Sequence, residues 1–194
     1  MDKSVSNTGN YRNRLRYIIL SMLQLSSAIL NVPILSLRTS DVIATAIEPI
    51  INPTNLKIEG FYCDDALEKK QLILLCQDIR DIVADGFIVD DHERLVDPQE
   101  LVRLKDVLDL HFELLGKPVE TTGKDKVGKV SDYAVETSSM YIQKIYASRS
   151  LFKSLTGGSL SIDRSQVLEV NDKRIIINDL LQTVPATATA PIGG

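Results

Sequence analysis

Hydrophobic residues along this chain fall into short runs that are separated by turn residues. The runs are three to ten residues long and rich in β-branched side chains, a pattern typical of β-strands. Asn52, Pro53 and Asn55 form a turn between two such runs, as expected of a hairpin connection. The strands predicted in this way cover residues 32–37, 42–51, 56–63, 71–76, 87–89, 118–122, 127–136, 141–147, 160–163 and 174–177.

The pattern of runs occurs twice. Residues 43–63 align without a gap with residues 127–147, so that Ile58 falls on Ile142 and Tyr62 on Tyr146. The match continues upstream at a shift of 85 and downstream at a shift of 88. This period is too long for a solenoid repeat and has the length of a small domain. We therefore expect two copies of one domain, over residues 22–96 (the first copy) and 111–182 (the second copy).

A helix is predicted between the copies, over residues 97–110. Asp97 is a good cap, Pro98 suits the first helical position, and Glu100 completes a capping box. Leucines 101, 104 and 108 share one face, which we expect to pack across the junction of the two copies. Weak helical periodicity over residues 77–83 suggests one or two turns there. Residues 1–21 and 183–194 are polar or rich in Ala, Thr, Pro and Gly, and we expect them to be disordered.

Charge divides the two copies, although the 194-residue chain as a whole carries only −4. Residues 23–109 hold 8 Lys/Arg against 16 Asp/Glu, whereas residues 117–174 hold 10 against 7. Opposite charges would help the copies dock or give them different partners; two solvated surfaces that drifted apart are the alternative. Aromatic residues are few (5%, no Trp), so the core is expected to consist mainly of Ile, Leu and Val.

The cysteines and the hydropathy favour a cytoplasmic protein. Cys63 and Cys76 lack metal-ligand spacing and end apolar runs, so we expect buried free thiols in a reducing compartment rather than a disulfide across a hairpin. No apolar stretch reaches the length of a membrane-spanning helix. Residues 12–30 look like a signal peptide at first, but polar residues interrupt the apolar run and we expect no export.

Two stretches of the second copy resemble a known family. Residues 128–136, G-K-V-S-D-Y-A-V-E, and residues 164–177, R-S-Q-V-L-E-V-N-D-K-R-I-I-I, are similar to the PRC-barrel. The resemblance covers most of residues 117–180 and, more weakly, residues 30–91, where Ala44 replaces the usual glycine. It implies a mainly β protein with two tandem small β-barrels joined by a short α-helix.

The resemblance also implies structural roles for three motif residues. Gly128 would permit a tight entry or bulge, and Asp132 would hydrogen-bond backbone at a turn. Glu48 occupies the position equivalent to Asp132, which argues for a shared structural task rather than an acid–base pair.

PRC-barrel proteins include a photosynthetic reaction-centre subunit, a ribosome maturation factor and archaeal division proteins, which dock on other macromolecules. The resemblance therefore implies a non-catalytic interaction or adaptor protein whose partner is another protein or complex. The expected contact surface is the basic face of the second copy with an amphipathic segment at residues 148–155. Its candidate residues are Arg149, Phe152, Lys153, Lys144 and Lys129.

Other partners stay open. The alternative function is a small-subunit ribosome-assembly factor that binds a ribosomal protein or rRNA, although the glycine-rich signature of that factor's N-terminal domain is missing. Nucleic acid is an unlikely partner of the basic second copy, because a net charge of +3 is weak. Peripheral contact with an anionic membrane and a homodimer through exposed strand edges are further possibilities.

Catalytic chemistry has little support in the residues. His92 stands among acidic residues and would suit a cation site, but a polar loop after a strand is the better interpretation. His111 is expected to be packed and hydrogen-bonded, and Asp64, Asp65 and Glu68 to form a solvated loop tip. The chain contains no phosphate-binding loop, dinucleotide fingerprint or nucleophile elbow. We therefore expect no enzyme activity, no cofactor and no metal.

Overall fold

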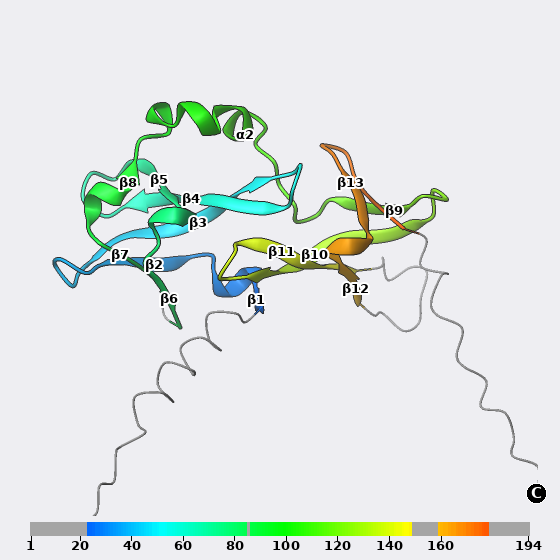
Figure 1. The fold of residues 1–194 in the computed structure, drawn as a ribbon, viewed down its shortest axis with the longest axis horizontal. Helices are drawn as coiled ribbons and strands as arrows, with labels where there is room; N and C mark the ends of the chain where they lie inside the picture. Colours follow the sequence, from blue (N-terminus) through cyan, green and yellow to red (C-terminus); the bar gives the residue numbers. More distant parts are fainter. Residues whose placement is uncertain (1–22, 85, 149–158, 179–194) are drawn as a thin grey trace, which may run out of the picture.

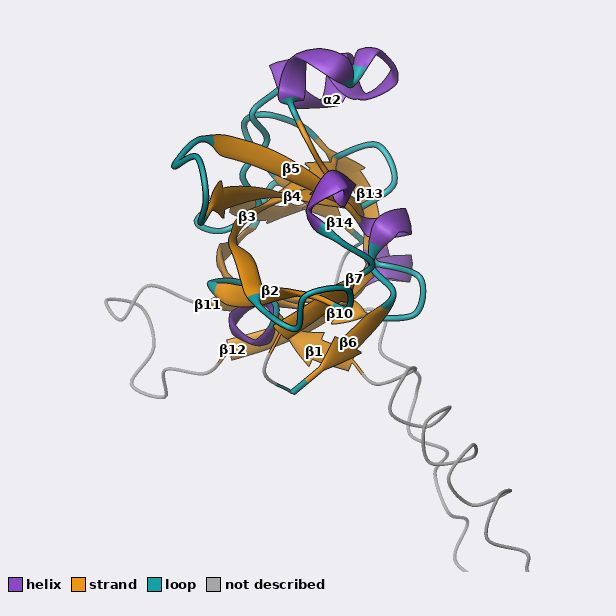
Figure 2. Ribbon diagram, turned by 90° about the vertical axis from the view of Figure 1, so that its left-hand side faces the viewer, coloured by secondary structure: helices purple, strands orange, loops and turns teal. Residues whose placement is uncertain are grey.

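A computed structural model describes residues 23–84, 86–148 and 159–178, and the fold is mainly β (Figures 1 and 2). The two termini expected to be disordered and the amphipathic segment at 149–155 lie outside the described residues. In the described part of the chain, no helix has the length and hydrophobicity needed to cross a membrane.

The strands follow the apolar runs closely, and each of the ten predicted strands is present within one or two residues at each end. Residues 77–83 differ from the prediction of one or two helical turns: a 3-10 turn at Cys76–Asp78 is followed by a strand at Asp81–Val83. The strands are β1 (Leu23–Leu25), β2 (Val32–Ser36), β3 (Val42–Asn52), β4 (Lys57–Asp65), β5 (Gln71–Leu75), β6 (Asp81–Val83), β7 (Gly86–Val89), β8 (Leu95–Val96), β9 (Pro118–Thr121), β10 (Lys126–Glu136), β11 (Tyr141–Ser148), β12 (Ser159–Asp163), β13 (Val167–Val170) and β14 (Ile175–Ile177).

The repeat in the sequence is also a repeat of strand pairing. In the first copy, β2–β3, β3–β4, β4–β5 and β6–β7 are antiparallel, and β2–β7 is parallel. In the second copy, β9–β10, β10–β11, β11–β12 and β13–β14 are antiparallel, and β9–β14 is parallel. Irregularities in the ladder recur as well, because the register shift at Ala46/Glu48 returns 84 residues later at Val130/Asp132. The two copies therefore share one topology.

Backbone conformation repeats in the turns too. Ser40 and Lys124, which are equivalent at a shift of 84, have φ values of 63° and 68°. Leu56 and Met140, at the same shift, have 54° and 58°. Left-handed backbone is unfavourable for residues other than glycine, so such pairs are unusual. Their recurrence shows that the turn geometry is set by the fold and not by the local side chains.

The two copies join edge to edge at β4 and β11. Lys57 pairs with Tyr141, its own equivalent, in antiparallel register. Around this pair, the Ile58 N–H donates to the Met140 carbonyl (2.8 Å) and the Ile142 N–H donates to the Leu56 carbonyl (2.9 Å). Each bond joins the residues that are equivalent, in the opposite copy, to those of the other bond. An approximate two-fold axis therefore passes through the junction. The result is one sheet with the order β13-β14-β9-β10-β11-β4-β3-β2-β7-β6.

The strand at the start of the first copy and the helix just before the second copy each contact the other copy. β1 pairs with β10 of the second copy, with Leu25 opposite Ala134. The helix α2 (Lys105–Asp109) precedes the second copy and contacts β3 of the first (Figure 1). The exchange ties the two copies into one body, and a single hydrophobic cluster runs through both.

The expected linker helix is broken. Residues 97–110 form two 3-10 turns, Pro98–Glu100 and Val102–Leu104, followed by the five-residue α2. Asp97 does cap the first turn by accepting the Gln99 N–H at 2.9 Å, but Leu101 leaves the helical region (φ −88°, ψ 62°). This break lets the segment arch over the first copy, so a single helical face that packs across the junction is not confirmed.

The expected closed barrels are also not observed. The described strands form a mixed sheet that is not closed, since β6 pairs only with β7, and β8 only with β5. In each copy the opening follows a 3-10 turn, at Cys76–Asp78 in the first and at Arg164–Gln166 in the second. Closure needs a continuous ladder around the barrel, and these corners interrupt it. Figure 2 shows how the strands curve around the middle of the molecule.

Candidate functional site

The predicted basic face is only partly described. Lys129 and Lys144 lie on adjacent strands, where Lys129 is opposite Ser148 and Lys144 is opposite Ala134. Lys144 donates to the Asp163 carboxylate at 2.7 Å, and this hydrogen bond raises the pKa of the lysine. Arg149, Phe152 and Lys153 lie outside the described residues. The structure therefore neither gathers these five residues into one surface nor separates them.

The equivalent acidic residues of the two copies differ in their contacts. The Asp132 carboxylate accepts the Ser26 hydroxyl at 2.6 Å and the backbone N–H groups of Ser26 (3.3 Å) and Tyr133 (2.7 Å). It thereby holds the segment after β1 against the second copy. Glu48 is exposed, and its carboxylate makes no hydrogen bond to the described residues. Gly128 has φ 157° and adjoins a register shift between β9 and β10.

His92 is bound to a buried carboxylate. Its Nε2 lies 2.8 Å from Asp65 Oδ1, and the Asp65 side chain is fully buried. Asp65 also accepts the backbone N–H groups of Leu67 (3.3 Å) and Glu68 (2.9 Å). The prediction that Asp65 is solvated is therefore wrong, because a loop 27 residues away covers it. No group of three potential metal ligands occurs among the described residues.

His111 is exposed, in contrast to the packed histidine that we expected. It lies at a left-handed backbone position, with φ 43°, directly before the buried Phe112. The next lysine covers that ring, since Lys117 Nζ lies 4.5 Å from the centroid of Phe112. The aromatic side chain, and not the histidine, anchors this end of the linking segment.

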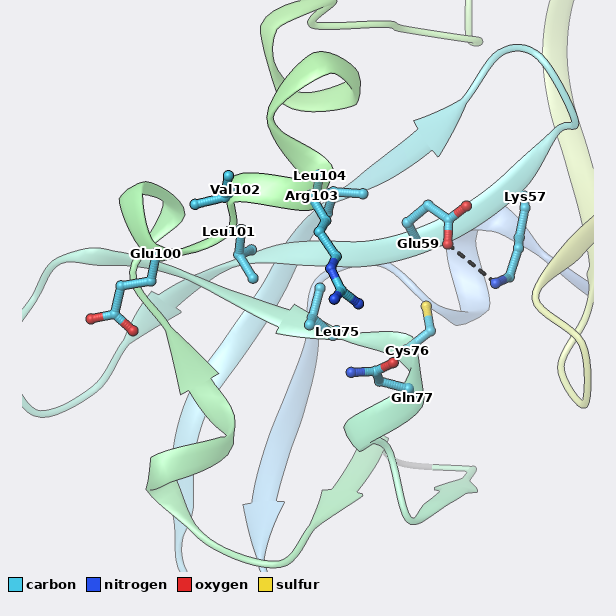
Figure 3. A pocket seen from close by; sticks show the side chains of 10 residues that line it. All are labelled: Lys57, Glu59, Leu75, Cys76, Gln77, Glu100, Leu101, Val102, Arg103 and Leu104. Carbon is cyan, nitrogen blue, oxygen red and sulfur yellow. Dashed lines mark ion pairs between the residues drawn. The ribbon is translucent and has the colours of Figure 1, made fainter.

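A groove with a volume of about 480 Å³ lies beneath the arch at residues 98–104. Sequence reasoning missed it, because it arises only when the segment folds over β4 and β5. We call it the arch groove (Figure 3). Its lining residues are Lys57, Glu59, Leu75, Cys76, Gln77, Glu100, Leu101, Val102, Arg103 and Leu104.

The arch groove combines apolar walls with charges of both signs. Lys57 and Glu59 form an ion pair on β4 with an N–O distance of 3.2 Å. The guanidinium of Arg103 points from the arch toward β5 and Leu75 (Figure 3). Val102, which also lines the groove, is 79% exposed. Such a mixed surface suits a peptide segment better than a purely apolar ligand.

The environment of the thiol in the arch groove disfavours its reactive thiolate form. Burial raises the pKa of Cys76 to about 12, so the thiolate needed for nucleophilic attack is scarce. Burial likewise raises the pKa of the fully buried Cys63 to about 12. Both cysteines are free, as predicted, and Cys63 is buried, whereas Cys76 is only half-buried.

At the equivalent place in the second copy, two of its own side chains contact each other. At the shifts of 84 and 88, Lys57 corresponds to Tyr141 and Cys76 to Arg164. Arg164 lies over the Tyr141 ring, with its guanidinium carbon 4.2 Å from the centroid. A small thiol in place of this arginine leaves the corresponding space open in the first copy.

No protein-family model matches the chain, and a search of curated proteins finds no match.

Proposed function

We propose that this protein is a non-catalytic interaction protein, an adaptor that binds another protein through the arch groove. The observation that carries the proposal is the groove itself: a cavity of about 480 Å³ with leucine side chains, a fixed ion pair and a guanidinium on its surface. Cavities of this size and composition accommodate several side chains of a partner segment.

The architecture supports docking by presenting the groove on a rigid base. β4 lies in the middle of the sheet and carries Lys57 and Glu59 on its surface. A Cβ added at Gly60 would lie 2.7 Å from the Leu74 carbonyl oxygen, so β4 and β5 approach closely beneath the groove. A pre-formed surface of this kind loses little conformational entropy on binding.

We also propose that both copies are relatives of the PRC-barrel. The support is the resemblance of residues 128–136 and 164–177, together with the shared topology of the two copies. The family's preference for docking on macromolecules agrees with the adaptor proposal. We further propose a cytoplasmic location, which the two free cysteines favour.

Site-specific photo-crosslinking in cells tests the adaptor proposal. A photo-reactive amino acid replaces Val102, on the arch, and in a matched variant replaces Leu168, an exposed apolar residue of the second copy. We expect one discrete crosslinked protein from position 102 and none from position 168. The same product from both positions, or no product from position 102, would contradict docking at the arch groove.

A small-subunit ribosome-assembly factor is the second candidate. The observation that favours it is a group of exposed lysines in the second copy without ion pairs among the described residues, namely Lys124, Lys126, Lys129 and Lys173. Binding to rRNA through such lysines would weaken steeply with salt. Sedimentation of the tagged protein with small ribosomal subunits at low salt, lost at high salt, would support this function over the adaptor. Flotation with membranes would point instead to peripheral lipid contact, and a purely soluble peak would oppose both.

A further inference from the structure

We infer that the partner segment places an acidic side chain in the arch groove, where its carboxylate pairs with Arg103. This inference rests on the proposed docking function and adds the chemistry of the partner. The segment we expect is extended and carries one Asp or Glu next to apolar residues.

Arg103 differs from the other described arginines of the first copy. Ion pairs join Arg38 to Asp91 (3.6 Å), Arg80 to Asp90 (3.1 Å) and Arg94 to Asp78 (3.6 Å). Within residues 23–84, 86–148 and 159–178, Arg103 has no such carboxylate partner. A guanidinium that points into a groove without an ion pair is a ready site for a carboxylate from outside.

The neighbouring charges leave this cation available. Lys57 and Glu59 neutralise each other on the floor of the groove, at 3.2 Å. Glu100 lies at the opposite end of the arch from Lys57, and its carboxylate points away from Arg103 (Figure 3). The positive charge of Arg103 therefore faces the groove without local compensation.

The surrounding first copy favours a single carboxylate over a more highly charged anion. Residues 23–109 hold twice as many acidic as basic side chains, 16 against 8. A phosphate dianion or a run of acidic residues would be repelled by this surface. One acidic side chain with basic residues beside it in the partner would satisfy both Arg103 and the acidic surroundings.

The apolar wall explains why the carboxylate would be flanked by apolar residues. Leu75, Leu101 and Leu104 line the groove together with the stem of Arg103. An apolar side chain that fills this wall also excludes water from the ion pair, which strengthens the electrostatic attraction. In the second copy, Arg164 takes the position equivalent to Cys76 and lies over Tyr141.

Cys76 provides an internal reporter of occupancy. The chain contains two cysteines, and Cys63 is fully buried, so alkylation of the native full-length protein should report on Cys76 alone. The rate of alkylation by iodoacetamide would be measured at about pH 9, where thiolate is more abundant than at neutral pH. The probes are the peptides acetyl-Leu-Glu-Leu-Lys-amide and acetyl-Leu-Gln-Leu-Lys-amide at millimolar concentrations.

We expect the Glu peptide to protect Cys76 at a concentration about threefold lower than the Gln peptide, the effect of one partly exposed ion pair. Arg103→Gln should abolish the difference between the peptides, and Arg103→Lys should retain part of it. Lys105→Gln is the matched control, because it removes a positive charge from an exposed position that follows the arch and does not line the groove, and it should leave the difference in place. Circular dichroism would verify that each variant is folded.

The outcomes separate this inference from the proposed function. Equal protection by both peptides, or protection by neither, would overturn the carboxylate inference, even where crosslinks from position 102 uphold docking. A difference between the peptides that persists in Arg103→Gln would also overturn it, since another group would then recognise the acid. Absence of crosslinks from position 102 would refute the docking function itself.

Discussion

Replacement of Asp65 by alanine should lower the free energy of unfolding by about 3 kcal/mol, because three hydrogen bonds to a buried carboxylate are lost. The bond with His92 is charge-assisted, because the Asp65 carboxylate is ionised, and it contributes about 1–2 kcal/mol. The two backbone N–H groups contribute about 0.5–1 kcal/mol each, since they lie in an exposed loop where water replaces part of the loss.

A conservative replacement isolates the charge. Asp65→Asn retains an oxygen acceptor for the backbone N–H groups and removes the negative charge that faces His92. We expect a smaller loss, of about 1–2 kcal/mol. Asp64→Ala is the matched control, because Asp64 is the neighbouring residue and is exposed. Its effect should stay within about 0.5 kcal/mol.

The effect of Asp65→Asn should depend on pH in a defined direction. Burial by itself raises the pKa of Asp65, but the hydrogen bonds from His92, Glu68 and Leu67 outweigh it and lower the pKa below the ordinary carboxyl value. A group with a lowered folded-state pKa stabilises the protein above its unfolded-state pKa of about 4. This contribution disappears as the pH falls through the folded-state pKa, so the difference between wild type and Asp65→Asn should shrink in acid.

Urea unfolding followed by far-ultraviolet circular dichroism, at neutral pH and at about pH 3, measures these differences. The reasoning would be refuted if Asp65→Ala cost no more than Asp64→Ala at neutral pH. It would also be refuted if the loss in Asp65→Asn were the same at both pH values.

Three further predictions concern packing and the thiols. Gly60→Ala should destabilise the protein by about 1–3 kcal/mol, because the added Cβ would lie 2.7 Å from a carbonyl oxygen of β5. Gly123→Ala is the control: the nearest atom to its added Cβ is 3.6 Å away, so it should have little effect in the same urea titration. Tyr133→Phe should raise the unfolding temperature, because the fully buried hydroxyl has no hydrogen-bond partner among the described residues; a fall would show that a partner exists. In the native protein, Cys76 should react slowly with Ellman's reagent, and Cys63 should react only after denaturant is added. Immediate reaction of both thiols would contradict the burial of Cys63.

Local patterns in the sequence predicted the strands and the repeat. Short β-branched runs bounded by turn residues need only their neighbours in the chain to favour extended backbone, so strands such as β3 and β10 were predicted within a residue of their observed ends. The short strands β1, β6, β8 and β13 were not predicted, because two to four residues carry too little pattern. The helix over 97–110 was predicted from good capping residues, but its turns separate at Leu101, where contacts with the first copy outweigh helix propensity.

The candidate site was beyond the reach of sequence patterns. The arch groove exists because residues 98–104 cross β4 and β5, and no periodicity in either segment specifies that crossing. Asp65 was assigned to a solvated loop because its immediate neighbours are acidic, whereas His92, distant in the sequence, buries and binds it. Both features depend on which segments meet in space.

The sequence by itself thus determined that the chain is mainly β and built from two copies of one pattern, since side-chain alternation and turn residues act over a few neighbouring positions. Only the tertiary structure decided that the copies join at Lys57 and Tyr141, that β1 and α2 each contact the opposite copy, and that a groove opens beneath the arch over the first copy. Edge pairing uses backbone groups that every strand carries, so the choice of partner is made by the packing of the whole molecule.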